Sequence, residues 1–362
     1  MTRPGIIVNS TGRPCGTPIL SVIVPVHNAP AELKQCLSAL AHSTYKSFEV
    51  IVVDDGSTES REVLLPDGRF RYIRLDARRG PSRARNVGAA SAVGDYLVFI
   101  DADVRVHRDT LSRFVAGFSK DPQLGAIIGA YDDSPADPGF LSQYKNLFHR
   151  YIHQCSKGMI NTFWSGCGAM RRDLFLGLGG FNAAQYREAS IEDIELGMRA
   201  EAGGVRIILD SRIQGKHLKR WTFWNLVKTD IFDRGIPWMR LILRRGVLSD
   251  TLNLKRNQRI SVVLAYVTGL SILASLRLPS LEMGALASAA AVTVMNLDLY
   301  RFFMARKGAW FTIRVLPMHW LYLIYCGACF WVGVLLYLLD VFRTSEMKEP
   351  REDRLLAPDD SV

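Results

Sequence analysis

The chain has 362 residues, of which 48% are hydrophobic, and it carries a formal net charge of +10. That length supports one large domain with an appendage, and its core needs no disulfides. The positive charge does not indicate nucleic acid as a partner. Many Lys and Arg residues flank apolar C-terminal segments, where anionic lipid headgroups account for them.

The cysteines suit a reducing compartment. Only Cys326 and Cys329 lie close together, inside an apolar run without a nearby His cluster. Small packing residues are therefore a better interpretation of this pair than metal ligands. The N-terminal residues lack the long apolar run of a signal peptide, so we expect the domain that follows them to stay in the cytoplasm.

Short apolar runs alternate with amphipathic segments over the first hundred residues. The runs predict strands at 20–25, 48–53, 72–75 and 95–100, and the segments between them predict helices at 30–41 and 81–92. This alternation is typical of an α/β fold with a mostly parallel sheet flanked by helices. Ligands bind beyond the carboxyl ends of such strands, and two of these strands end in acidic clusters.

The C-terminal part has a different composition. Residues 221–245 mix Trp, Phe and Leu with Lys and Arg, which is typical of amphipathic helices at a membrane interface, and Pro237 should split them into two. A helix packed on the domain's own core is the alternative. Three apolar stretches follow, at about 260–277, 281–297 and 315–340, and the turn at 277–280 indicates a helical hairpin.

Six motifs occur in order along the N-terminal part: SVIVPVHN, VIVVDDGSTE, RGPSRARNVGA, YLVFIDADV, GGFN and IEDIELGMR. Together they resemble a family 2 glycosyltransferase of the GT-A fold, a Rossmann-like α/β domain, over residues 20 to about 221. The resemblance implies an inverting, metal-dependent enzyme of the hexosyltransferase type that uses a nucleotide-sugar donor. We therefore predict these segments: a flexible N-terminus at 1–18, a GT-A domain at 19–220, interfacial helices at 221–258, about three transmembrane helices at 259–342 and a polar tail at 343–362.

The resemblance implies a divalent metal, Mg²⁺ or Mn²⁺, at the DxD motif. Carboxylates suit such an ion, which as a Lewis acid offsets the charge of a departing nucleoside diphosphate. By resemblance, Asp103 is the direct metal ligand and Asp101 faces the ribose or the water shell of the metal. His217 is a further candidate that could reach the metal or the pyrophosphate. The plain alternative is that the two aspartates only cap the next helix.

The donor is expected to bind along the same sheet edge. By resemblance, Asp55 accepts a hydrogen bond from the base, which suggests uracil and a UDP-sugar, although His27 stands where the family often has Tyr. Arg220 and Trp221 match a segment that closes over the donor. The other predicted donor-binding residues are Pro25, Asp54, Arg79, Arg85, Asn86, Asp101 and Ala102.

The acceptor side is predicted from the IED motif and a Gly-rich loop. By resemblance, Asp193 is the general base for the acceptor hydroxyl and Glu192 supports it, with Ser190 as a plausible N-cap of their helix. Trp164, Gly166, Cys167 and Gly168 are predicted to surround the sugar and the acceptor. Trp164 could equally be a buried core residue.

These features predict a multi-pass protein of the inner (plasma) membrane that transfers sugar to a lipid or lipid-linked acceptor. Glycolipid or cell-envelope polysaccharide synthesis is the expected role, with the lipid bilayer as a partner. Two alternatives stay open: a processive polysaccharide synthase, and a non-catalytic scaffold that binds nucleotide sugars. The sequence leaves the sugar, the acceptor and the oligomeric state open.

Overall fold

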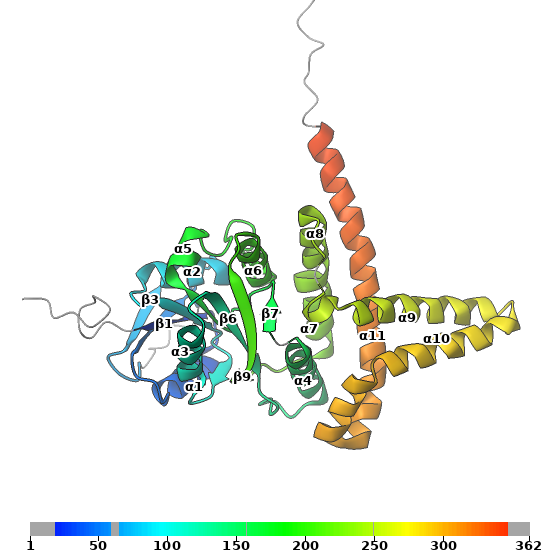
Figure 1. Ribbon diagram of the computed structural model, residues 1–362, viewed down its shortest axis with the longest axis horizontal. Coiled ribbons are helices and arrows are strands. Elements are labelled where there is room, and N and C mark those ends of the chain that lie inside the picture. The colour runs from blue at the N-terminus through cyan, green and yellow to red at the C-terminus, as the bar shows by residue number, and fades with distance from the viewer. Residues whose placement is uncertain (1–18, 59–64, 157, 249, 347–362) are drawn as a thin grey trace, which may run out of the picture.

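The computed structural model describes residues 19–58, 65–156, 158–248 and 250–346 (Figure 1). The predicted flexible N-terminus and the tail beyond residue 346 lie outside this part. Its strands are β1 Leu20–Val26, β2 Phe48–Asp54, β3 Phe70–Arg74, β4 Tyr96–Ile100, β5 Val104–Val106, β6 Leu124–Tyr131, β7 Gly158–Ile160, β8 Cys167–Arg171 and β9 Arg206–His217. Its domain helices are α1 Pro30–Ala41, α2 Pro81–Ser91, α3 Thr110–Lys120, α4 Phe140–Cys155, α5 Arg172–Gly177 and α6 Glu192–Ala202. The helices that follow are α7 Phe223–Lys228, the π-helical η1 Thr229–Gly235, α8 Ile236–Arg245, α9 Arg256–Ser275, α10 Glu282–Met295 and α11 Leu297–Glu346.

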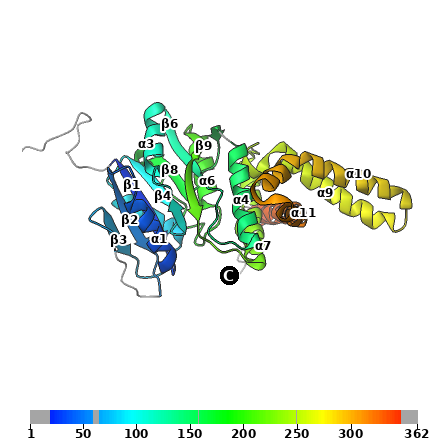
Figure 2. The same ribbon diagram turned by 90° about the horizontal axis from the view of Figure 1, so that it is seen from below.

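The strands form a mixed sheet in the order β3-β2-β1-β4-β8-β6-β9-β5, and β7 pairs with β9 (Figure 2). The four predicted strands are confirmed, and they form the parallel part β3-β2-β1-β4. The sheet as a whole is mixed: β6 and β9 also pair in parallel, whereas β8 runs antiparallel to both β4 and β6. β3 begins two residues earlier than predicted, since buried Phe70 already pairs with Val50 of β2.

Helices cover both faces of the parallel part, which explains the continuous apolar runs of its strands. In β1, Val22 and Val24 share one core cluster with Leu33 and Leu37 of α1. Ile23 points the other way, into the cluster that includes residues of α2. Strand side chains alternate between faces, so β1 is buried on both.

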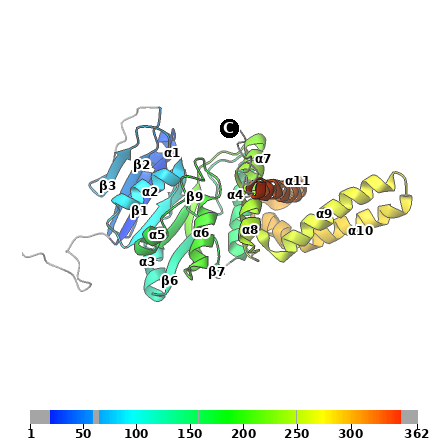
Figure 3. The same cartoon turned by 90° about the horizontal axis from the view of Figure 1, so that it is seen from above.

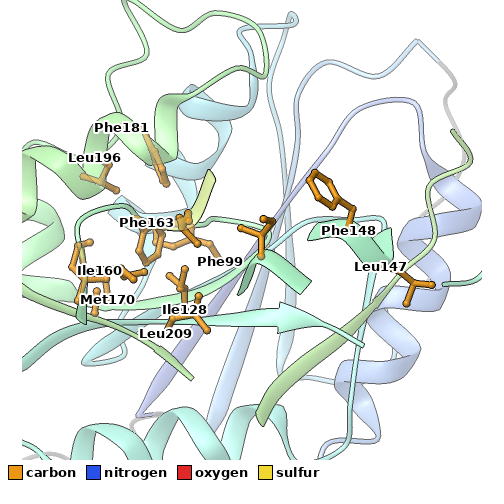
Figure 4. Close-up of a cluster of buried hydrophobic side chains, with 14 of the residues drawn as sticks. Phe99, Ile128, Leu147, Phe148, Ile160, Phe163, Met170, Phe181, Leu196 and Leu209 are labelled. Carbon is orange, nitrogen blue, oxygen red and sulfur yellow. The ribbon is translucent and has the colours of Figure 1, made fainter. Parts of the chain in front are cut away.

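The second cluster links the sheet to the C-terminal helices. Figure 4 shows part of it around Phe99, whose ring centroid lies 6.0 Å from Phe163 and 5.2 Å from Phe181. The same cluster continues through α4, where the Phe148 ring meets Tyr322 of α11 at 4.9 Å. The C-terminal helices therefore pack on the α/β domain through α4.

Residues 223–245 form one helical run in which a π-helical turn, η1, precedes Pro237. The predicted break at Pro237 is therefore a change of helix type, not an interruption of the helix. Proline has no N–H for the carbonyl of Asp233, and the Ser190 hydroxyl donates to that carbonyl instead, at 2.6 Å. The run is amphipathic, since Leu226 is buried whereas Trp224 is 78% exposed.

The predicted hairpin at 277–280 is confirmed: α9 and α10 pack side by side and project away from the α/β domain (Figures 1 and 3). Among the described residues, two helices are long and apolar enough to cross a membrane, α9 and the segment Leu297–Arg343 of α11. The 14 residues of α10 span about 21 Å, short of the ~30 Å hydrocarbon core. α11 also contains a kink at Gly308, with φ 77°.

A glycine of α6 sets how closely this helix approaches the loop before β8. A Cβ on Gly197 would lie 2.0 Å from the backbone nitrogen of Phe163, whereas a Cβ on Gly177 of α5 would meet nothing within 4 Å. We expect Gly197→Ala to lower the free energy of unfolding by about 1–3 kcal/mol, because backbone must move. Gly177→Ala is the matched control and should be neutral or slightly stabilising in denaturant titrations. Equal stability of the two variants would contradict this account of the α6 contact.

Candidate active site

A cavity of about 410 Å³ lies beyond the carboxyl ends of β1, β2 and β4, at the predicted sheet edge. It collects side chains from segments far apart in the sequence. The predicted residues that line it are Pro25, His27, Asp55, Arg85, Asp101, Ala102, Asp103, Trp164, Glu192, Asp193, His217 and Trp221.

Asp55 anchors the wall of the cavity next to β2. Its two carboxylate oxygens accept the backbone N–H groups of Arg79 and Gly80, at 2.7 and 2.8 Å. His27 Nδ1 lies 2.9 Å from the Asp55 carbonyl oxygen, so the imidazole is fixed against the same turn. Each carboxylate oxygen keeps a free lone pair for a further donor.

Arg85 ties together the two acidic motifs. Its guanidinium donates to Asp101 Oδ1 at 2.7 Å and to Glu192 Oε1 at 3.0 Å, and its side chain is 5% exposed. Burial opposes its positive charge, but the two carboxylates outweigh burial and raise the pKa of Arg85. Arg85 thereby sets the position of the DxD segment relative to the start of α6.

Asp103 and His217 meet where β5 pairs with β9, because Val104 is opposite His217 in the register. His217 Nε2 lies 3.3 Å from Asp103 Oδ2, its Nδ1 lies 2.6 Å from Asn146 Oδ1, and its ring stacks on Tyr131 at 4.4 Å. Burial opposes ionisation of Asp103, but the hydrogen bond and charge of His217 outweigh it and lower the pKa of Asp103. No three His, Cys, Asp or Glu side chains of the described ranges converge on one metal position.

Asp193 lies in the first turn of α6, beside the cavity. Its Oδ2 accepts the backbone N–H of Ser165 at 3.1 Å, and its Oδ1 accepts that of Ile194 at 2.8 Å. Burial and the adjacent charge of Glu192 raise the pKa of Asp193 to about 6. The predicted N-cap is wrong: Ile191 precedes the helix, and the Ser190 hydroxyl donates to Asp233 instead.

Several predicted donor-binding residues serve the protein itself. The carboxylate of Asp54 is buried, where it accepts from Tyr72 and from the Ser57 N–H. The Asn86 amide exchanges two hydrogen bonds with the Phe181 backbone, at 2.8 and 2.9 Å, and so fixes the GGF turn. Arg79 contributes its backbone N–H to Asp55, and its side chain lines a neighbouring groove.

The loop and gate predictions also need correction. A Cβ on Gly166 would meet the Trp164 ring at 2.7 Å, and one on Gly168 would meet the Trp164 carbonyl at 2.4 Å, so these glycines make room for Trp164. Cys167 is fully buried in β8 and lies outside the cavity lining. The Arg220 side chain is 83% exposed and points to Asp137, outside the cavity.

Other cavity residues were not predicted. Lys219, next to Arg220, turns inward and places its Nζ 4.2 Å from the centre of the Trp221 ring. Arg78, Tyr131 and Arg234 also line the cavity. In an extended segment, consecutive side chains point to opposite faces, so Lys219 and Arg220 cannot both face the cavity. This alternation beyond β9 could have indicated Lys219. Arg234 lies in η1, beyond the predicted end of the GT-A domain, and no pattern in the sequence indicates that it faces the cavity.

Comparisons with known proteins agree with this architecture. Residues 21–178 match the family Glycosyl transferase family 2. An uncharacterized glycosyltransferase of Haemophilus influenzae is 30% identical over 190 residues, which cover 49% of this chain and 60% of that protein. Glycosyltransferase GlyG of Streptococcus pneumoniae is 34% identical over 124 residues, 32% of this chain and 41% of that protein. The matched segments thus cover less than two thirds of the length of each of these relatives.

A solved structure shares the fold at low sequence identity. Mannosyltransferase PcManGT from Pyrobaculum calidifontis, in complex with GDP-Man and Mn²⁺, superposes with a TM-score of 0.51 and 19% identity, over 89% of this chain and 88% of that one. The sheet order, the acidic residues at the strand ends and the segment that matches the family all indicate the same fold. The α/β domain therefore has the GT-A fold, and its residues 21–178 are similar to glycosyl transferase family 2.

Proposed function

We propose that the protein is a membrane-associated glycosyltransferase that moves a hexose-type sugar from a nucleotide-sugar donor to a lipid-embedded acceptor, with inversion. The observation that carries this proposal is one cavity lined by six carboxylates, those of Asp55, Asp101, Asp103, Glu188, Glu192 and Asp193, in a domain that matches family 2. The aspartates that follow β2 and β4 suit a nucleotide and a metal-bound diphosphate, and Asp193 at the start of α6 suits an acceptor proton.

The donor would lie along the edge from β2 to β5. Asp55 and His27 would contact the base, for which uracil is our expectation, and Asp101 would face the ribose. Lys219 and Arg78 line the same cavity and would offset part of the diphosphate charge. Trp221, buried beneath Lys219, would close the far side.

The residues at β5 and β9 fit a divalent metal. A carboxylate and an imidazole on paired strands, 3.3 Å apart, suit Mn²⁺ or Mg²⁺ if the diphosphate and water supply the other ligands. Asp103 and His217 would hold the ion. When bound, the ion would supply Lewis-acid stabilisation of the departing diphosphate.

Asp193 would act as the general base. The acceptor oxygen forms a bond to the anomeric carbon, the bond from that carbon to the diphosphate breaks, and the hydroxyl proton passes to Asp193. A carboxylate with a pKa of about 6 is largely ionised at pH 7 and can accept this proton. The Ser165 N–H orients it, and Glu192 would support it through Arg85.

The membrane assignment rests on α9 and α11, which expose large apolar side chains such as Leu270 and Trp331, each 65% exposed. We place the protein in the inner membrane, crossing it more than once, with the GT-A domain in the cytoplasm. Lys255, Arg256 and Arg259 at the start of α9 suit the cytoplasmic side. A processive synthase is disfavoured because the described part of the chain contains two long apolar helices, which are few for a channel.

The test is nucleoside diphosphate release by the full-length protein in detergent, with UDP- and GDP-sugars, Mg²⁺ or Mn²⁺, and a membrane lipid extract as the acceptor source. GDP-sugars belong in the panel because the structural neighbour holds GDP-Man. We expect release from one donor, dependent on metal and increased by the extract. Donor binding without release under every condition would favour the non-catalytic scaffold instead.

A further inference from the structure

Asn146 of α4 contacts the imidazole of His217 on the side away from Asp103. The Asn146 Oδ1 atom lies 2.6 Å from His217 Nδ1, whereas the other ring nitrogen, Nε2, lies 3.3 Å from Asp103 Oδ2. Asn146 is 2% exposed and His217 is 6% exposed. The lining of the cavity includes His217 but not Asn146. This hydrogen bond is therefore made inside the protein, behind the residue that faces the proposed metal position.

Three segments that are far apart in the sequence hold this imidazole. His217 ends β9 and Tyr131 ends β6, and the two strands pair in parallel with Tyr131 opposite Gly215. The helix α4 packs against both strands and brings Asn146 to the ring. The orientation of the ring is therefore set by tertiary packing and not by the local chain alone.

Stacking fixes the plane of the imidazole but not which edge of the ring faces Asp103. The ring of Tyr131 lies 4.4 Å from that of His217, with an angle of 10° between their planes. A flat aromatic face does not distinguish a ring nitrogen from a ring carbon. A half-turn of the imidazole within this stack would exchange Nδ1 with Cδ2 and Nε2 with Cε1. Asp103 would then face a C–H group, so a second contact is needed to hold Nε2 in place.

The amide of Asn146 supplies that second contact. An amide oxygen accepts hydrogen bonds and cannot donate them, so the proton between the two residues is on His217 Nδ1. In a neutral imidazole with a proton on Nδ1, the lone pair is on Nε2, the nitrogen that faces Asp103. A reversed amide would donate to Nδ1 and leave the ring proton on Nε2. The amide oxygen thus leaves Nε2 free to bind a cation.

Stability alone does not explain an asparagine at this position. Its neighbours Leu147 and Phe148 are buried, and Asn146 Nδ2 is buried without a hydrogen-bond partner among the described residues. A buried donor without a partner costs at least as much free energy of folding as one hydrogen bond contributes. A leucine of similar size would avoid that cost. The bond to His217 therefore indicates a role in placing the imidazole.

We infer that Asn146 positions His217 as a metal ligand: its amide oxygen accepts the Nδ1 proton and thereby holds the Nε2 lone pair toward the ion that Asp103 also binds. This inference rests on the proposed function and adds a positioning residue that lies outside the cavity. Metal-binding imidazoles nearly always donate their second N–H to an oxygen acceptor or water, which orients the ring. Asn146 would act on the metal only through His217.

The test is the Mn²⁺ affinity of the full-length protein in detergent with saturating UDP, measured by EPR titration and repeated with GDP. We expect Asn146→Leu to weaken Mn²⁺ binding by roughly 10–100-fold, but not more than His217→Ala does. Asn146→Asp should bind Mn²⁺ at least as tightly as the wild type, because a carboxylate oxygen also accepts the Nδ1 proton.

The matched control is Gln143→Leu, which removes another buried amide of α4. The Gln143 side chain donates to the backbone carbonyls of Pro135 and Asp137, away from the imidazole. This variant should bind Mn²⁺ as the wild type does. A general loosening of α4 would instead weaken Mn²⁺ binding in Gln143→Leu as much as in Asn146→Leu.

Two further readouts separate positioning from a structural role. Pulsed EPR of the bound Mn²⁺ should show coupling to an imidazole nitrogen in the wild type and in Asn146→Asp, none in His217→Ala, and weaker coupling in Asn146→Leu. The melting temperature of Asn146→Leu without metal should stay near that of the wild type, because one hydrogen bond and one unpartnered donor are removed together.

The outcomes distinguish this inference from the proposed function. Wild-type Mn²⁺ affinity in Asn146→Leu overturns the inference, and so does a loss in Asn146→Asp or in Gln143→Leu as large as in Asn146→Leu. Unchanged affinity in His217→Ala would contradict the proposed metal site together with the inference. Absence of Mn²⁺-dependent binding of either nucleotide in the wild type would contradict the proposed function itself.

Discussion

Replacement of Asp193 by Asn should lower kcat/KM for sugar transfer by about 10²–10⁴-fold, because Asn cannot accept the acceptor proton. The wild-type pH profile gives a second signature. The pKa of Asp193 is raised to about 6, so kcat/KM should rise with pH and reach half its maximum near pH 6. Below that pH the carboxyl is protonated and cannot act as a base. The Asn variant should lose this acidic limb.

The control for Asp193→Asn is Glu201→Gln, which removes an exposed carboxylate from the same helix, α6. It should retain wild-type kcat/KM and the limb near pH 6. If Asp193→Asn kept the limb, another group would be the base. If instead it kept nearly full activity on a phosphate acceptor, the reacting oxygen would already be ionised and Asp193 would only orient it.

Replacement of Asp103 by Asn should reduce kcat/KM by roughly a hundredfold or more, because Lewis-acid stabilisation of the diphosphate contributes several kcal/mol. Asn keeps the shape of the side chain but removes the charge that attracts the cation. We therefore expect calorimetry to show Mn²⁺-dependent nucleoside diphosphate binding in the wild type and little dependence on Mn²⁺ in the variant.

Asp109→Asn is a suitable control for this measurement, since Asp109 forms a surface pair with Arg113. Its nucleotide binding should depend on Mn²⁺ as in the wild type. Retention of metal-dependent binding by Asp103→Asn would place the metal elsewhere. A parallel series with His217→Ala tests the second proposed ligand, and a smaller loss is expected because a carboxylate can still attract the ion.

The contacts of Arg85 in the structure differ from the contact that the sequence suggests. The sequence suggests a donor contact, whereas the structure places its guanidinium between Asp101 and Glu192. The RARN motif and the IED motif, 107 positions apart at Arg85 and Glu192, thus form one charged unit. This arrangement explains how the carboxylates of Asp101 and Glu192 keep a fixed separation.

The sequence alone was sufficient for the parallel half of the sheet and for the residues at its carboxyl edge. A buried run such as Leu20–Val26 is stable only inside the sheet. Asp55 and Asp101 directly follow β2 and β4, the two strands that pair with it, so the ends of these strands place both residues. Residues attached directly to strand ends are therefore placed by local chain geometry. The pair of Asp103 and His217 is different, because neither β5 nor β9 was predicted and only the family resemblance suggested both residues as metal ligands.

Only the tertiary structure shows which side chains next to these strand ends face the cavity. Lys219 rather than Arg220 points inward, and Asn86 binds Phe181, 95 residues away, rather than a nucleotide. The periodicity of the sequence predicts which side of a helix or strand a side chain occupies. It does not predict which residue of a distant segment that side chain contacts. For the same reason the cavity between α4, η1 and α11 was not predictable, because these helices meet only through long-range packing.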